Sequence, residues 1–247
     1  MISFFRKIRQ KLLAQNRVTR YLIYALGEIL LVVIGILIAL QINNWNESRK
    51  DRAFELEMLS EINRELLSEI EDKKEALIFF KKGEKSLNEL LKMRIDDEYP
   101  RDSLEQHLNN LASVGLFFPY SDGAYEALKS GGFDKIKNKK LRNDLIRLYS
   151  YEFKLVSIYV NELARPTMIE KFELFYQIFP KQLSPGPEGV LIESLDYSKF
   201  EELVLTEKFM ELITVGNDVV SSVKPRLQDI LRQMNEVQKQ VENEISK

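Results

Sequence analysis

The sequence predicts an all-α protein, with one N-terminal transmembrane helix followed by a helical bundle of long antiparallel helices. Three observations lead to this prediction. An uncharged apolar run, Ile29–Ile42, lies near the N-terminus. Beyond it, apolar residues recur at steps of three and four over most of the chain, which is typical of a helix with one buried face. No stretch shows the convincing alternation of a half-buried strand.

The composition fits one ordinary domain beside a membrane anchor. The chain has 247 residues, of which 45% are hydrophobic and 30% are charged. Residues 43–247 contain 30 basic and 37 acidic residues, a net charge of −7, which argues against nucleic-acid binding by this part. The absence of cysteine excludes disulfides and thiolate metal sites.

Residues 21–42 form the predicted transmembrane helix. These 22 residues would make a helix about 33 Å long, enough for a hydrocarbon core of roughly 30 Å. A cleaved signal peptide is the alternative. It fits less well, because the apolar run is long and ends in Ala39-Leu40-Gln41 rather than in a small-x-small cleavage site.

The charges beside the helix predict its orientation. Residues 1–20 contain six Lys or Arg and no acidic residue. The positive-inside rule keeps such a segment cytoplasmic and places residues 43–247 outside the cytoplasm. We therefore expect a bacterial inner-membrane protein with a periplasmic domain; a mitochondrial inner-membrane protein is the alternative.

Residues 1–20 also show an amphipathic pattern. A helix lying on the cytoplasmic lipid surface is one interpretation, and a charged topology signal with incidental apolar residues is the other. Aromatic rings are placed to anchor the two membrane interfaces: Tyr21 and Tyr24 at the inner one, Trp45 at the outer one.

Glu28 is the one ionisable residue in the predicted span. A carboxyl group facing lipid is unfavourable, so we expect it to face a partner helix, water or the headgroups. It begins a stripe that would let helices approach closely through a small-xxx-small pair. The predicted helix-packing stripe is Glu28, Val32, Gly35 and Ala39. Homo-oligomerisation through this stripe is the favoured interpretation, and a proton or ion path the alternative.

The outer domain reads as helices of different length. The pattern predicts helices over 47–94, 102–114, 138–179, 197–213 and 217–245, with a break near Arg165-Pro166 and a loop over 180–188. The last helix alternates steps of three and four, as in a coiled coil, and the first long helix is its expected partner.

The segment 115–133 is the least repetitive part of the chain. Its aromatic residues either line a pocket or groove for a ligand or partner, or they pack in the core under a loop; packing is favoured because no polar constellation accompanies them. These residues are Phe117, Phe118, Tyr120, Tyr125 and Phe133.

No motif for catalysis or cofactor binding is found. His107 is the only histidine, and its neighbours show no catalytic spacing. We expect it to be a packed histidine and predict no metal, no cofactor and no enzymatic activity.

Four segments are distinctive: residues 4–10 and, most specifically, residues 21–47, with a weaker signal in 125–130 and 136–142. Through them the chain resembles a family of uncharacterised single-span membrane proteins common in Bacteroidota, particularly flavobacteria. The resemblance implies an envelope location and carries no catalytic residues.

The function expected from these features is that of an anchored scaffold, interaction or ligand-sensing module. Its expected partners are the lipid bilayer, further copies of the chain, and an envelope protein or small ligand. Conduction of ions or protons by an oligomer that uses Glu28 is the alternative, and an unrecognised enzyme is the third possibility.

Overall fold

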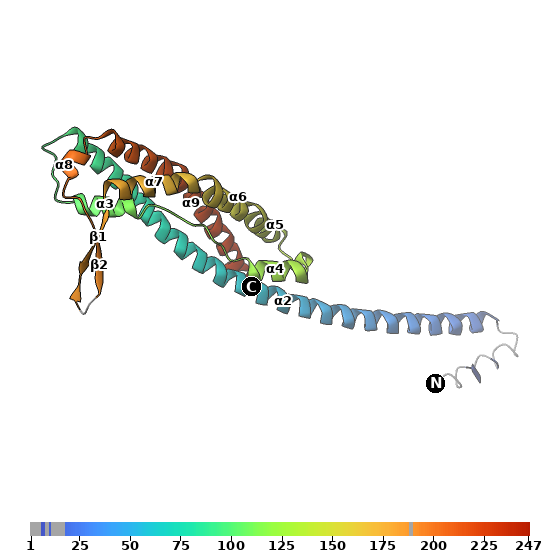
Figure 1. Ribbon diagram of the computed structural model, residues 1–247. Coiled ribbons are helices and arrows are strands. Elements are labelled where there is room, and N and C mark those ends of the chain that lie inside the picture. Colours follow the sequence, from blue (N-terminus) through green and yellow to red (C-terminus); the bar gives the residue numbers. More distant parts are fainter. Residues whose placement is uncertain (1–5, 8–9, 11–17, 188–189) are drawn as a thin grey trace. The chain divides into compact units, whose positions relative to one another are not determined.

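The structure confirms the predicted helical class. It is a computed structural model that describes residues 6–7, 10, 18–187 and 190–247 (Figure 1). The elements are α2 (Val18–Ile95), α3 (Leu104–Ala112), α4 (Gly123–Gly131), the 3₁₀ turn η1 (Phe133–Lys135), α5 (Lys139–Arg147), the π-helix η2 (Leu148–Glu152), α6 (Phe153–Ile158), the π-helix η3 (Tyr159–Leu163), α7 (Arg165–Ile178), β1 (Lys181–Pro185), β2 (Leu191–Leu195), α8 (Phe200–Leu203) and α9 (Glu207–Ile245).

The chain divides into two units, Met1–Glu55 and Leu56–Lys247. In the described part of the first unit, α2 supplies the long helix. One helix in the described residues, α2, is long and apolar enough to cross a membrane, and its apolar window is not buried at all. The amphipathic pattern predicted for residues 1–20 falls mostly outside the described residues.

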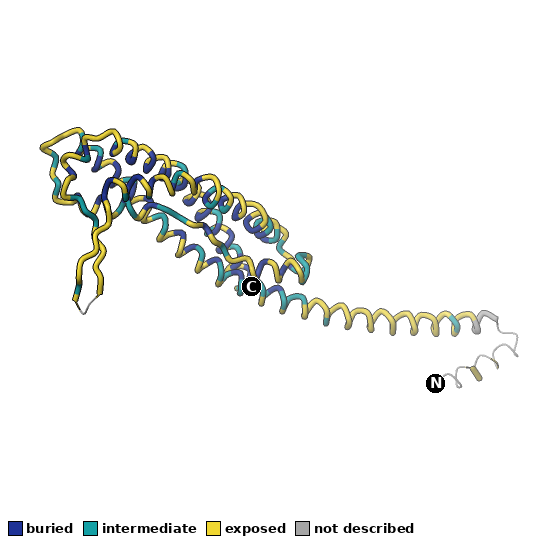
Figure 2. The backbone as a smooth tube through the Cα atoms, viewed as in Figure 1, coloured by how far each residue is buried: buried dark blue, intermediate teal, exposed yellow. Residues whose placement is uncertain are grey.

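The second unit has a core formed mainly by α2, α7 and α9 (Figure 2). Leu59, Ile62, Leu66 and Ile70 of α2 are buried at the steps of three and four seen in the sequence. One turn later the buried position is occupied by Lys73, which is only 3% exposed. A polar side chain therefore interrupts the apolar face of α2.

Helix α9 runs antiparallel to α2, as predicted. Gln238 of α9 hydrogen-bonds Asn63, and Lys224 forms an ion pair with Glu84. Residue numbers therefore fall along α9 in the direction in which they rise along α2, so the two helices are antiparallel. The sequence suggested two helices here, but α9 continues unbroken from its Thr206 cap through Pro225.

The predicted helix 138–179 is one helical run with three irregularities. Asn138 caps it by accepting a hydrogen bond from the backbone N–H of Leu141 at 3.2 Å. The π-helices η2 and η3 interrupt it, and a break at Ala164 precedes Pro166, which lies in the first turn of α7. Proline tolerates that position because the first N–H groups of a helix have no intrahelical partner.

The prediction of a loop over 180–188 without strands was wrong. The strands β1 and β2 form an antiparallel hairpin, in which Lys181 is opposite Leu195 and Pro185 is opposite Leu191. The hairpin projects from the bundle beside α3 and α8 (Figure 1).

Candidate functional site

The first candidate surface is the apolar part of α2. Fourteen Leu, Ile and Val side chains from Leu22 to Ile42 are 46–71% exposed. Tyr24 and Trp45, two of the predicted interface anchors, are 60% and 66% exposed, while the side chain of Tyr21 lies outside the described residues. Apart from Glu28 and Gln41, this helix surface is therefore apolar on all sides, and it carries aromatic rings near its ends.

The predicted helix-packing stripe lies on this surface. Glu28 and Val32 line a shallow groove of about 370 Å³ together with Ala25, Ile29 and Val33. A Cβ placed on Gly35 would meet no atom within 4 Å. Gly35 and Ala39 are exposed, so the stripe is open to a neighbouring helix. Association through it remains a prediction.

The segment 115–133, the aromatic segment, is bound to α2 through three side chains of that helix. Glu69 accepts a hydrogen bond from the backbone N–H of Ser121 at 2.9 Å and forms an ion pair with Lys73 at 2.8 Å. Lys73 in turn donates to the carbonyl oxygen of Pro119 at 2.9 Å and lies 4.8 Å from the centre of the Phe118 ring. One turn earlier, a Glu65 oxygen accepts from the first turn of α4. Residues one helical turn apart on α2 thus fix the backbone of this segment.

The aromatic side chains mostly pack against one another. Phe118 and Tyr125 are 0% and 2% exposed. The ring of Tyr125 stacks on Tyr149 with centroids 4.6 Å apart, and Tyr149 meets Phe153 edge to face at 5.1 Å. Tyr120 and Phe133 flank this cluster, whereas Phe117 is 61% exposed and lies outside it. The arrangement is that of a core, with Phe117 as its exposed neighbour.

Two buried polar atoms beside this cluster have no hydrogen-bond partner in the described part of the chain: Glu65 Oε2 and the hydroxyl of Tyr149. Burial raises the pKa of Tyr149, and the nearby carboxylate of Glu65 raises it further. The phenol therefore stays protonated and can act as a donor at neutral pH.

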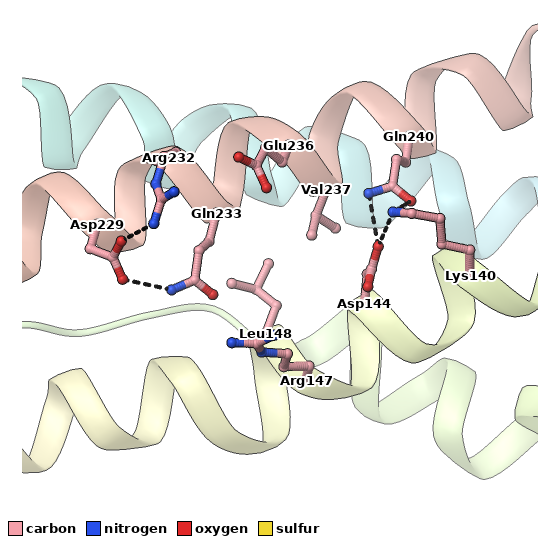
Figure 3. A pocket seen from close by; sticks show the side chains of 10 residues that line it. All are labelled: Lys140, Asp144, Arg147, Leu148, Asp229, Arg232, Gln233, Glu236, Val237 and Gln240. Carbon is pink, nitrogen blue, oxygen red and sulfur yellow. Dashed lines mark hydrogen bonds and ion pairs between the residues drawn. The ribbon is translucent and has the colours of Figure 1, made fainter.

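A polar groove of about 340 Å³ lies between α5 and α9 (Figure 3). At one end Asp144 accepts hydrogen bonds from Lys140 at 2.6 Å and from Gln240 at 2.9 Å. At the other end Asp229 is held by Arg232 and by Gln233. Three cationic and three anionic side chains line the groove, which suits a zwitterionic or mixed-charge partner. They are Lys140, Arg147 and Arg232, with Asp144, Asp229 and Glu236.

The two aspartates of this groove are stabilised as anions. Burial acts to raise the pKa of Asp144, but the hydrogen bonds from Lys140 and Gln240 outweigh it, and the pKa is lowered. The Arg232 hydrogen bond lowers the pKa of Asp229. Both carboxylates are therefore charged at neutral pH.

A second, more apolar groove of about 360 Å³ adjoins the polar one through Asp229 and Gln233. It lies between α6 and α9, where the π-helices η2 and η3 flank α6. The guanidinium of Arg226 stacks over the Tyr159 ring at 3.4 Å. Segments of π-helix occur often at functional sites, which makes this face of the bundle a candidate binding surface.

His107 occupies a small polar network away from these grooves. Its Nδ1 lies 3.0 Å from Ser86 Oγ, which accepts a hydrogen bond from Asn110. Burial lowers the pKa of His107, and this effect outweighs the nearby carboxylate of Glu89, which acts to raise that pKa. His107 is 8% exposed and hence a packed histidine, neutral at pH 7.

Across the described residues, no group of three or more His, Cys, Asp or Glu is arranged to hold a metal ion. Sequence reasoning missed the grooves because their lining is recognisable only once α5, α6 and α9 are packed together. The one signal available was the pair of charged residues at a spacing of four, Lys140 and Asp144.

Comparison with known proteins gives one family. The family model DUF6090, described as a family of unknown function, matches residues 28–179. The chain belongs to this family. The match begins at Glu28 and includes the aromatic segment and the run from α5 to α7, while the hairpin and α9 follow it. No curated protein and no solved structure matches this DUF6090 protein.

Proposed function

We propose that this DUF6090 protein is a single-pass membrane protein whose helical domain is a non-enzymatic scaffold, interaction or ligand-sensing module. The exposed apolar surface of α2 from Leu22 to Ile42 is the observation that supports the proposal most strongly. Fully burying one such side chain contributes about 1.5–3 kcal/mol. Fourteen of them, each about half exposed, would together gain roughly 10–20 kcal/mol on leaving water.

The bilayer is the environment that fits this surface. Lipid surrounds a helix on all sides, whereas a soluble partner covers one face. The position of the cationic residues supports a cytoplasmic N-terminus and an extracytoplasmic domain, residues 43–247. In a bacterium with two membranes, the domain would then be periplasmic.

The stripe containing Glu28 supports homo-oligomerisation. The open space at Gly35 would let a second helix come close. The proposed module role is supported by the two adjoining grooves on α9, because one is polar and the other more apolar. Together they suit an amphipathic ligand or a partner helix.

Topology can be tested with single cysteines, because the chain has none. Gln10→Cys and Lys247→Cys place a thiol on each side of the proposed span. After the outer membrane has been permeabilised, a maleimide that cannot cross the inner membrane should label Lys247→Cys and leave Gln10→Cys unlabelled until the inner membrane is broken. Labelling of both while the inner membrane is intact, or release of the protein by alkaline carbonate without detergent, would contradict the proposal.

Ion or proton conduction is the second candidate, because Glu28 lines a groove on the apolar helix. In that case Glu28→Gln abolishes proton flux into liposomes that contain the protein. The control is Glu47→Gln, which lies past the apolar run and should leave flux unchanged. Equal flux in Glu28→Gln and the unaltered protein removes this candidate.

A further inference from the structure

Both strands of the β1–β2 hairpin have backbone groups that could form hydrogen bonds with a further strand. It is the only sheet in the described residues, and its strand residues are exposed along almost their whole length. A two-stranded hairpin is marginally stable in water on its own. Each strand also leaves one edge without a partner strand, and an open edge is a template for pairing.

One face of the hairpin carries most of its apolar strand residues, together with one Lys and one Glu. Residues opposite each other in an antiparallel pair share a face, as do residues two apart. Leu183, Pro185 and Leu191 therefore lie together, beside the cross-strand ion pair of Lys181 and Glu193. Leu183 and Leu191 are 66% and 63% exposed.

The hydrogen bonds at the two ends fix which backbone groups point outward. The N–H of Asp196 donates to Pro180 at 2.9 Å, and that of Gly186 donates to Val190 at 2.7 Å. Hydrogen-bonded pairs alternate along an antiparallel ladder, so the pairs 182/194 and 184/192 bond within the hairpin. The backbone groups of residues 181, 183 and 185 on β1, and of 191, 193 and 195 on β2, face outward. Pro185 thus lacks an N–H on the outward edge, where the hairpin itself needs none and where a neighbouring strand would find one donor fewer.

The two edges differ in their ability to pair with a second copy. Antiparallel pairing of two β2 strands about their centre would place Glu193 opposite Glu193 of the second copy. Like charges directly opposite are destabilising. Pairing of two β1 strands about their centre places Leu183 opposite Leu183 and Lys181 opposite Pro185. The two Leu183 residues would exchange both hydrogen bonds, and each Lys181 N–H would reach a Pro185 carbonyl.

We propose that the β1 edge binds β1 of a second copy of the chain, giving a four-stranded antiparallel sheet in the order β2–β1–β1–β2. The sheet continues this mostly apolar face of each hairpin across a two-fold axis at Leu183. The inference rests on the proposed function, because anchoring in one membrane confines both copies and raises their effective concentration. A short edge interface is sufficient under that condition.

Disulfide crosslinking in native membranes tests the pairing, and the cysteine-free full-length chain is the background. Leu183→Cys places two thiols at a hydrogen-bonded pair, where Cα atoms lie about 5.5 Å apart, within the range for a disulfide. Leu191→Cys, on β2 and similarly exposed, is the matched control, because it leaves Glu193 in place. After mild oxidation, Leu183→Cys should run as a dimer on a non-reducing gel, with at least tenfold more dimer than Leu191→Cys.

Ala39→Cys, on the predicted helix-packing stripe, separates this inference from the proposed function. A dimer of Ala39→Cys without one of Leu183→Cys overturns the hairpin pairing alone. Failure of both overturns self-association altogether. Equal crosslinking of Leu183→Cys and Leu191→Cys, or a Leu183→Cys adduct with the mass of a different protein, also overturns the pairing of two β1 strands.

Discussion

Lys171 should make the stability of the domain depend on pH. Its side chain is completely buried, and its Nζ donates to the carbonyl oxygens of Leu111 at 2.9 Å, Ala112 at 3.2 Å and Val114 at 2.6 Å. These carbonyls lie at the C-terminal end of α3, where the helix leaves acceptors without intrahelical partners. Lys171 therefore ties α7 to the end of α3.

The sign of the effect follows from proton binding. Burial lowers the pKa of Lys171 from 10.5 to about 7. Between these values the unfolded chain holds a proton that the folded chain has released, so the free energy of unfolding rises with pH. Each pKa unit corresponds to about 1.36 kcal/mol, and the gain between pH 7 and 9 is about 2 kcal/mol.

Lys171→Met isolates this contribution. Urea unfolding of the full chain in detergent, followed by circular dichroism, measures the free energy at pH 7, 8 and 9. The unaltered protein should gain about 2 kcal/mol relative to Lys171→Met over this range. Lys154→Met, which removes an exposed lysine on α6, should follow the unaltered protein. Parallel curves for the unaltered protein and Lys171→Met would refute the reasoning, whatever their absolute offset.

Four further substitutions test the core around the aromatic segment by thermal or urea unfolding. Phe118→Ala should cost about 3–5 kcal/mol, and Phe117→Ala, at an exposed ring, less than about 0.5 kcal/mol; equal losses would contradict the packing. Lys73→Met should cost about 3 kcal/mol by leaving a largely buried Glu69 without its cation, and no loss would show that the ion pair is dispensable. Gly83→Ala should cost about 1–3 kcal/mol, because the added Cβ would overlap Val114; unchanged stability would refute that close contact.

Much of the fold follows from apolar spacing. The buried residues of α2 and α9 recur at three and four, and this pattern predicts long helices whatever their partners. The hairpin gives no such signal, because Lys181–Pro185 and Leu191–Leu195 are short and one contains proline. The π-helices give no sequence signal either, since the residues that flank them keep right-handed helical dihedral angles and the chain continues as one helical run.

The candidate sites differ in the same way. The exposed apolar helix is readable from the sequence because lipid, its proposed surroundings, needs no partner residue in the chain. The contacts that fix the aromatic segment to α2 cannot be predicted from the sequence, because Lys73 and Pro119 are 46 residues apart. When a lysine lies on an otherwise apolar helix face, the sequence does not show which group its ammonium binds. Only the packed structure shows that Lys73 and Lys171 both bind backbone carbonyls.

The residues matched by the family model do not contain the complete hydrophobic core of the domain. The match ends at residue 179, one residue after the end of α7. Helix α9 follows it, yet α9 contributes sixteen buried residues and packs closely on α7. At Gly216 the contact with Leu87 of α2 is so close that a Cβ would lie 3.0 Å from its side chain. Residues 28–179 alone would leave the inner faces of α2 and α7 open to water, so α9 must be counted as part of the folding unit of this DUF6090 protein.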